Sequence, residues 1–150
     1  MSDCCKVPGE SFDLVILGGG SGAFAAASRA TSLGATVAIV ERGVIGGTCL
    51  NVGCVPSKIL IAAAKVRHSA RQRAFAGVPT AAGNVDAVAL FAQKSAMLDH
   101  FRQEKYIDLV ARTENLTYIE GEARLLSPSA VAVSVGELRD RTLHAGKIIV

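Results

Sequence analysis

Apolar residues in the first forty positions form two short runs with a helical segment between them. Residues 12–17 and residues 36–40 are nearly continuously apolar, which is typical of strands buried on both faces of a parallel sheet. Residues 24–33 are small and mostly apolar, and Gly34 follows them as a stop signal for a helix. The pattern therefore predicts a βαβ unit that begins near Phe12.

Two longer segments have apolar positions at helical spacing. Residues 54–76 predict one helix, which ends before Gly77. Asp86 is a suitable N-cap for a second helix that continues to about Arg112. The apolar stripe along this second helix predicts packing against the rest of the domain.

The last third of the chain contains short apolar segments bounded by turn residues, which is typical of strands. The whole pattern predicts an α/β domain made of a parallel sheet with helices and a small antiparallel β meander. We expect this domain to be incomplete, because the chain stops inside an apolar strand. The predicted strands are residues 116–120, 130–135 and 147–150, with turns at Ser127-Pro128 and near Gly136.

The composition of the chain limits the kinds of molecule that it is expected to bind and where it is expected to act. Half of the 150 residues are apolar and 19% are charged, so one domain with a real core is expected. The net charge of +3, the absence of Trp and the few aromatic residues give no reason to expect nucleic acid. Residues 1–11 are polar, predict a flexible tail and contain no secretory signal. Charged residues interrupt every apolar run, so we expect no membrane span and a cytoplasmic protein.

A glycine-rich turn follows the first predicted strand and opens the first predicted helix. Residues 18–23 read G-x-G-x-x-A, in which Gly18 permits the turn, Gly20 lets a pyrophosphate approach and Ala23 keeps helix and strand close. Glu41 ends the second strand, where an acid accepts hydrogen bonds from an adenosine ribose. An acid favours an unphosphorylated ribose, which argues against NADP but leaves FAD and NAD both open.

Cys49 and Cys54 stand in the glycine-rich approach to the next predicted helix. Pro56 suits a first helical turn, so Cys54 lies at or beside the helix start, where the dipole stabilises a thiolate. Lys58 follows four residues after Cys54, on the same helix face. Two close sulfurs, one of them activated, predict a dithiol that opens and closes. A two-electron partner beside such a dithiol favours a flavin, and so FAD.

Two other interpretations of the cysteines remain. A structural disulfide is disfavoured, because nothing in the chain indicates secretion. Half of a zinc site would need two more ligands, and Cys4 and Cys5 in the polar tail are poor candidates.

Together, residues 18–23, 41–43 and 46–58 resemble the class I pyridine nucleotide-disulfide oxidoreductases. Residues 104–106 and 121–124 look most like the mercuric reductase branch of that family; the dihydrolipoamide dehydrogenase branch is the alternative. A third hypothesis is a non-enzymatic thiol or metal-binding module. The resemblance implies that the predicted α/β domain is a Rossmann-like FAD-binding domain. It runs over residues 12–150 and covers only the front of the family's chain, so we expect the NAD(P)H and dimerisation domains to be absent.

The resemblance implies an enzyme that passes electrons from NADPH or NADH to FAD, then to a Cys49–Cys54 disulfide, then to substrate. Hg(II) is the implied substrate and a homodimer the implied assembly, whereas this segment alone is expected to be inactive. Cys49 and Cys54 are the implied redox pair and the transient ligands of Hg(II). The implied FAD-binding residues are Gly18, Gly20, Ser21, Gly22, Ala23, Glu41, Arg42, Gly43, Gly47, Thr48, Lys58 and Ala123.

Overall fold

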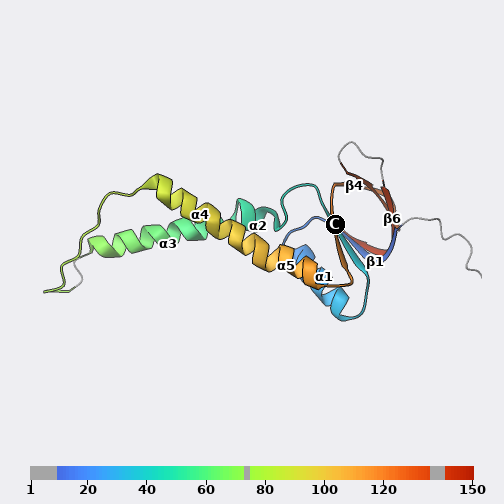
Figure 1. Ribbon diagram of the computed structural model, residues 1–150, viewed down its shortest axis with the longest axis horizontal. Helices are drawn as coiled ribbons and strands as arrows, with labels where there is room; N and C mark the ends of the chain where they lie inside the picture. Colours follow the sequence, from blue (N-terminus) through green and yellow to red (C-terminus); the bar gives the residue numbers. More distant parts are fainter. Residues whose placement is uncertain (1–9, 73–74, 136–140) are drawn as a thin grey trace, which may run out of the picture.

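A computed structural model describes residues 10–72, 75–135 and 141–150, and one mixed β-sheet is its centre (Figure 1). The strands are β1 (Glu10–Leu17), β2 (Val37–Glu41), β3 (Leu116–Glu120), β4 (Glu122–Ser127), β5 (Ala130–Ser134) and β6 (Arg141–Ile149). They form a six-stranded sheet in the order β3-β2-β1-β6-β5-β4.

The sheet has a parallel half and an antiparallel half. β1 pairs in parallel with β2 and β6, and β2 pairs in parallel with β3. β4, β5 and β6 form an antiparallel meander. The predicted fold class, a Rossmann-like α/β domain with a small meander, is therefore confirmed. β4 and residues 141–146 of β6 were not predicted.

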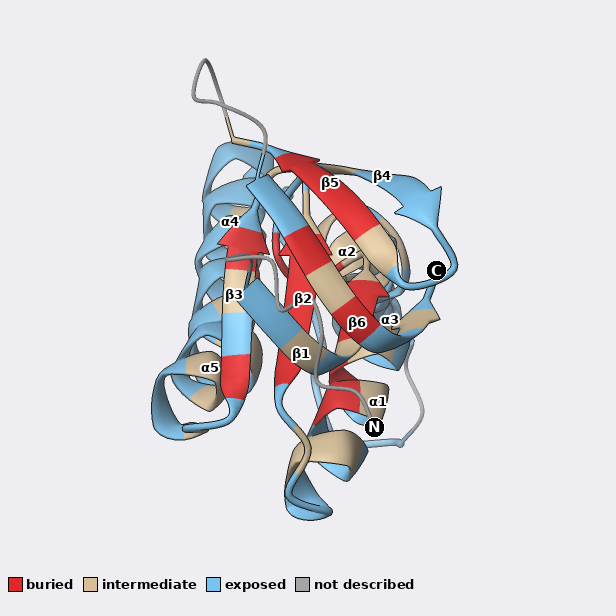
Figure 2. Cartoon of the chain, turned by 90° about the vertical axis from the view of Figure 1, so that its right-hand side faces the viewer, coloured by how far each residue is buried: buried red, intermediate tan, exposed pale blue. Residues whose placement is uncertain are grey.

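The core lies on both faces of the sheet. Ile16 and Ile39 face α1 (Ser21–Ser32), which contributes Phe24 and Ala27 to this layer. On the other face, Val15 packs in one buried cluster with residues of β2, β3, β5 and β6. Figure 2 shows these buried segments running through the strands. Burial on both faces is the reason that β1 and β2 are nearly continuously apolar.

Residues 10 and 11 correct the predicted tail. Glu10 and Ser11 belong to β1, where they pair with Leu143 and His144 of β6. The remaining tail residues, which include Cys4 and Cys5, lie outside the described residues, as does the turn expected near Gly136.

The remaining helical segments are α2 (Gly47–Asn51), α3 (Cys54–Arg71), α4 (Ala87–Arg102), the π-helical turn η1 (Gln103–Ile107) and α5 (Asp108–Arg112). The long helix expected between residues 86 and 112 is present as α4, η1 and α5 in succession. The helix expected over residues 54–76 ends five residues early, at Arg71. Gln72 is extended there, and the Thr80 hydroxyl donates to its carbonyl at 3.1 Å.

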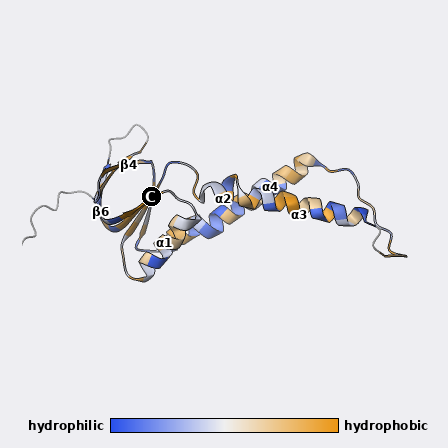
Figure 3. Ribbon diagram, turned by 180° about the vertical axis from the view of Figure 1, so that it is seen from behind, coloured by the Kyte–Doolittle hydropathy of each residue, from blue (hydrophilic) through white to orange (hydrophobic). Residues whose placement is uncertain are grey.

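α3 and α4 run side by side away from the sheet (Figures 1 and 3). The stripe on α4 was expected to pack against the domain, but Val88 and Phe91 remain 83% and 51% exposed. Leu98, farther along the same stripe, is buried. The stripe therefore packs on the domain only toward the C-terminal end of α4.

Residues 47–71, which cover α2 and α3, are long and apolar enough to span a membrane by length and composition alone. This corrects the expectation that charged residues exclude any such stretch. The two helices are not continuous, because α2 ends at Asn51 and α3 begins at Cys54. Several apolar side chains of α3 line a groove against α4, which gives its composition a role within the fold.

Asp86 caps α4 as expected, since its carboxylate accepts a hydrogen bond from the Ala89 N–H at 3.0 Å. Replacing Asp86 with alanine should lower the free energy of unfolding by about 1 kcal/mol, the usual cost of losing an N-cap. Urea denaturation measures this change. Glu114→Ala is a matched control at an exposed acid outside a helix start. Equal stability of the two variants would contradict the capping role.

Candidate functional site

The glycine-rich turn between β1 and α1 leaves open space beside its backbone. Gly18 has a φ of 109° and donates its N–H to the Val40 carbonyl at 2.7 Å. A Cβ built on Gly18, Gly20 or Gly22 meets no atom within 4 Å. No side chain caps the start of α1, and its first turn contains no acidic residue. The turn therefore offers a positive helix end and room for an anion to approach the backbone.

Glu41 is fixed at the end of β2 by two backbone donors. Its carboxylate oxygens accept hydrogen bonds from the N–H groups of Gly19 and Gly43, each at 2.6 Å. A Cβ on either glycine would lie 3.1 Å from the Glu41 side chain, so both positions favour glycine. Each carboxylate oxygen keeps a further lone pair with which it can accept a ribose hydroxyl.

A cleft of about 210 Å³ brings several of the predicted residues together. Glu41 and Ala123, which are far apart in sequence, both line this cleft, and Gly18 lies at its edge with Gly121. Arg42 also lines it and forms an exposed ion pair with Glu122 at 3.3 Å. The volume is small, and the lining is suited to one end of a dinucleotide.

Gly46 and Gly47 pack directly against the glycine-rich turn between β1 and α1. Gly20 and Gly46 form a parallel bridge, and the Gly46 N–H donates to the Gly19 carbonyl at 2.8 Å. Gly47 has a φ of 63°, and a Cβ there would lie 2.8 Å from the Cα of Gly20. Only a residue without a side chain fits this contact. This close contact places α2, with Thr48 and Cys49, beside the glycine-rich turn between β1 and α1.

The turn between α2 and α3 brings the two cysteines together. Cys54 is the first residue of α3, as the sequence predicts, whereas Cys49 lies in α2, a short helix that the sequence analysis did not predict. A Cβ on Gly53 would lie 2.9 Å from the Thr48 carbonyl oxygen, so glycine allows the chain to fold back closely. Both cysteines are free thiols, and Cys54 is exposed.

The side chains of Cys49 and Cys54 interact across the turn. Hydrogen bonding to the Cys54 side chain raises the pKa of Cys49; burial and the charge on Cys54 act in the same direction, and the Cys54 backbone acts in the opposite one. The interaction shows that the fold brings the two side chains near each other, as a dithiol requires.

Replacing Cys54 with alanine should lower the pKa of Cys49 toward the ordinary value of a thiol. The variant removes both the hydrogen bond and the charge that raise it. The rate of alkylation by iodoacetamide, measured against pH, gives this pKa, because the thiolate is the reactive form. Ser57→Ala on α3 is a control that leaves both sulfurs in place. An unchanged midpoint in Cys54→Ala would contradict the contact.

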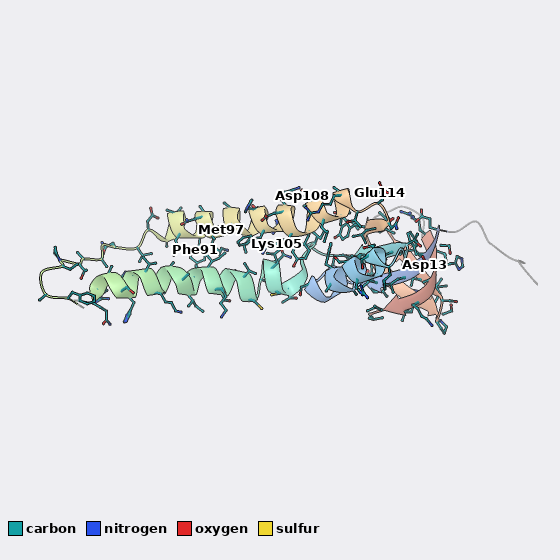
Figure 4. All side chains as sticks on the ribbon, turned by 90° about the horizontal axis from the view of Figure 1, so that it is seen from below. Asp13, Phe91, Met97, Lys105, Asp108 and Glu114 are labelled. Carbon is teal, nitrogen blue, oxygen red and sulfur yellow. The ribbon has the colours of Figure 1, made fainter. Side chains whose placement is uncertain are left out.

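Lys58 lies one turn after Cys54, and both line a groove of about 530 Å³ between α3 and α4. Apart from Gln93, the rest of the groove lining is apolar; Met97 lines it from α4, on the side of that helix toward α3 (Figure 4). The cleft at Glu41 and this groove share no lining residue.

Three residues near the dithiol were missed. Asn51 lies inside the cysteine motif, and Arg102 of α4 donates to it from 51 positions away. Burial raises the pKa of Tyr106, and the charge on Cys49 raises it further; its ring packs edge-on against Phe24 with centroids 4.8 Å apart. Asn51 had a signal in the cysteine motif and Tyr106 in the stretch 104–106, whereas Arg102 had none. No group of three or more His, Cys, Asp or Glu that could hold a metal occurs among the described residues.

The sequence profile of the pyridine nucleotide-disulphide oxidoreductases matches residues 12–150 of this chain. The chain belongs to this family. The predicted resemblance is thus confirmed, and membership of the family implies FAD and NAD(P)H as cofactors. The roles assigned above to single residues remain predictions.

Three relatives named mercuric reductase illustrate how far the similarity extends. The proteins from Lysinibacillus sphaericus, Staphylococcus aureus and Streptomyces lividans are 41%, 42% and 39% identical over 86%, 82% and 93% of this oxidoreductase chain. The chain covers 23%, 22% and 29% of their lengths, so it spans about a quarter of these relatives.

A solved structure supports the fold independently. It is the "Cu(II) complex of HOCl-induced flavoprotein disulfide reductase RclA from Escherichia coli", to which the chain is similar with a TM-score of 0.75 at 25% identity. The match covers 93% of this chain and 28% of that one.

Proposed function

We propose that this chain supplies the FAD cradle and the redox dithiol of an enzyme that reduces Hg(II), as in mercuric reductases. The observation that carries the proposal is the packing of Gly46 and Gly47 on the glycine-rich turn between β1 and α1. This packing sets the two interacting thiols beside that turn. The names of the three relatives support Hg(II) as the substrate.

The residues present fit FAD. The open space at Gly18, Gly20 and Gly22 suits a diphosphate on the first turn of α1, with Ser21 and Ala23 beside it. Glu41 has lone pairs left for a ribose, and Ala123 lines the same cleft. We assign further contacts to Arg42, Gly43, Gly47, Thr48 and Lys58. Bound FAD would supply two-electron transfer between NAD(P)H and the dithiol.

Cys49 and Cys54 suit a soft cation. Two thiols that bind Hg(II) release two protons and form two Hg–S bonds, and soft sulfur prefers such a metal. Reduction of Hg(II) to Hg(0) then takes two electrons, for which NAD(P)H is the source. Because Cys54 is exposed and Cys49 is partly exposed, an ion can reach the pair from solvent.

We also propose a homodimer and a cytoplasmic location for the whole enzyme, with no nucleic-acid or membrane partner. This chain alone should not turn over NADPH, because no residue assigned here binds a nicotinamide. Sedimentation of the whole enzyme and cell fractionation measure the assembly and the location.

The test is reconstitution of the chain with FAD, followed by gel filtration. We expect flavin absorbance to elute with the protein, and one equivalent of Hg(II) to remain bound in the presence of excess glutathione. A colourless protein would contradict the FAD cradle. Flavin binding with no retained Hg(II), together with dithiol exchange with reduced lipoamide, would favour a dihydrolipoamide dehydrogenase type. Retained Hg(II) without flavin would favour a simple metal-binding module.

A further inference from the structure

Asn51 connects three parts of the chain around the dithiol. Its side-chain N–H groups donate to the carbonyls of Val44, Ile45 and Gly47, at 3.2, 3.1 and 2.9 Å. Its side-chain oxygen faces the other way and accepts two hydrogen bonds from Arg102. Asn51 ends α2, two residues after Cys49, so whatever holds Asn51 also holds the helix that carries Cys49.

Arg102 of α4 holds the side-chain oxygen of Asn51 in place. Its Nε and Nη2 donate to the Asn51 oxygen at 3.1 and 2.9 Å, and its Nη1 donates to Asp99 at 2.7 Å. The Arg102 side chain is 24% exposed, whereas the Asp99 side chain is 70% exposed. The planar guanidinium uses its rigid fork for two bonds to one acceptor, a geometry that lysine does not reproduce.

We propose that Asn51 and Arg102 are positioning residues for the dithiol: their paired hydrogen bonds hold α2 against α4 and keep Cys49 beside Cys54. The inference rests on the proposed redox function and adds a residue from outside the cysteine motif to it. Preorganised groups react with a smaller loss of conformational freedom. A held Cys49 thus raises the effective concentration of one thiol near the other and favours the disulfide.

The equilibrium between dithiol and disulfide measures this effect without FAD. Oxidised glutathione takes two electrons and two protons from the Cys49 and Cys54 thiols. The two sulfurs form one S–S bond, and two molecules of reduced glutathione leave. The whole chain is equilibrated in glutathione buffers, trapped with an alkylating agent and weighed by mass spectrometry. Cys4→Ser and Cys5→Ser are present in every protein, so that only the pair of interest reacts.

Arg102→Lys keeps the positive charge and loses the paired bonds, and Arg102→Met loses both. We expect each variant to lower the equilibrium constant for disulfide formation about tenfold, which is about 30 mV for a two-electron couple. Asp99→Asn leaves the bonds to Asn51 intact and should stay within about twofold of the parent. Val131→Ala, in the buried core of β5, controls for general loss of stability and should also stay within about twofold.

Three outcomes overturn the proposal. If Arg102→Lys behaves like the parent, the charge and not the paired bonds sets the equilibrium. If both Arg102 variants leave the constant unchanged, α2 is held by other contacts. If Val131→Ala shifts the constant as much as they do, the effect is general destabilisation. A parent chain that forms no Cys49–Cys54 disulfide at all would instead contradict the proposed redox function.

Discussion

Cys54→Ser should abolish disulfide formation and lower the affinity of the chain for Hg(II) at least about a hundredfold, or about 2.7 kcal/mol. The reason is that Cys49, the one thiol of the pair that remains, must compete with free glutathione for the metal. Cys54 is exposed, so its replacement should change the free energy of unfolding by no more than about 0.5 kcal/mol. Equilibrium dialysis against Hg(II) in a glutathione buffer measures the affinity.

The matched control for this experiment lies in the same chain. A Cys4→Ser, Cys5→Ser variant keeps the pair at residues 49 and 54 and should bind Hg(II) like the parent. Cys49→Ser should behave like Cys54→Ser, because either replacement leaves only one thiol of the pair. Tight binding that survives in both single variants and disappears with Cys4 and Cys5 would place the metal in the tail.

Gly20→Val should lower the affinity for FAD at least about a hundredfold and leave the fold unchanged. Gly20 has a φ of −84°, which any residue adopts, and a Cβ there meets no atom within 4 Å. Its side chain would therefore enter the open space that we assign to the diphosphate. Fluorescence titration with FAD measures the affinity, and urea denaturation measures the stability.

Gly47→Ala provides the contrast, because the cost there falls on the protein itself. Its positive φ and the 2.8 Å approach to Gly20 make even a methyl group costly, so stability should fall by about 1–3 kcal/mol. Gly20→Val with normal FAD affinity would show that the cofactor does not approach the first turn. An unfolded Gly20→Val would contradict the open space found there.

Local patterns identified the βαβ unit well because each part has its own signal. Residues 14–17 of β1 and residues 37–40 of β2 pack on both faces of the sheet and are all apolar, and the glycines of the first turn follow from the backbone they need. α2 was missed, since five residues are too few to show an amphipathic period. The glycines around it were recognised, but not the short helix that they enclose.

Contacts between distant segments were the part that the sequence could not supply. The stripe on α4 was found, yet nothing in it indicated that Val88 and Phe91 would stay exposed. Arg102 has no local signal at all, because its partner Asn51 lies 51 residues away.

The most direct test of the central claim is the absorption spectrum of FAD bound to this chain, recorded with the cysteine pair as dithiol and as disulfide. If the pair lies beside the flavin, the spectrum changes between the two states, and the change disappears in Cys54→Ser. Identical spectra in both states, with FAD bound and the disulfide confirmed by mass, would show that the cradle and the dithiol do not form one site.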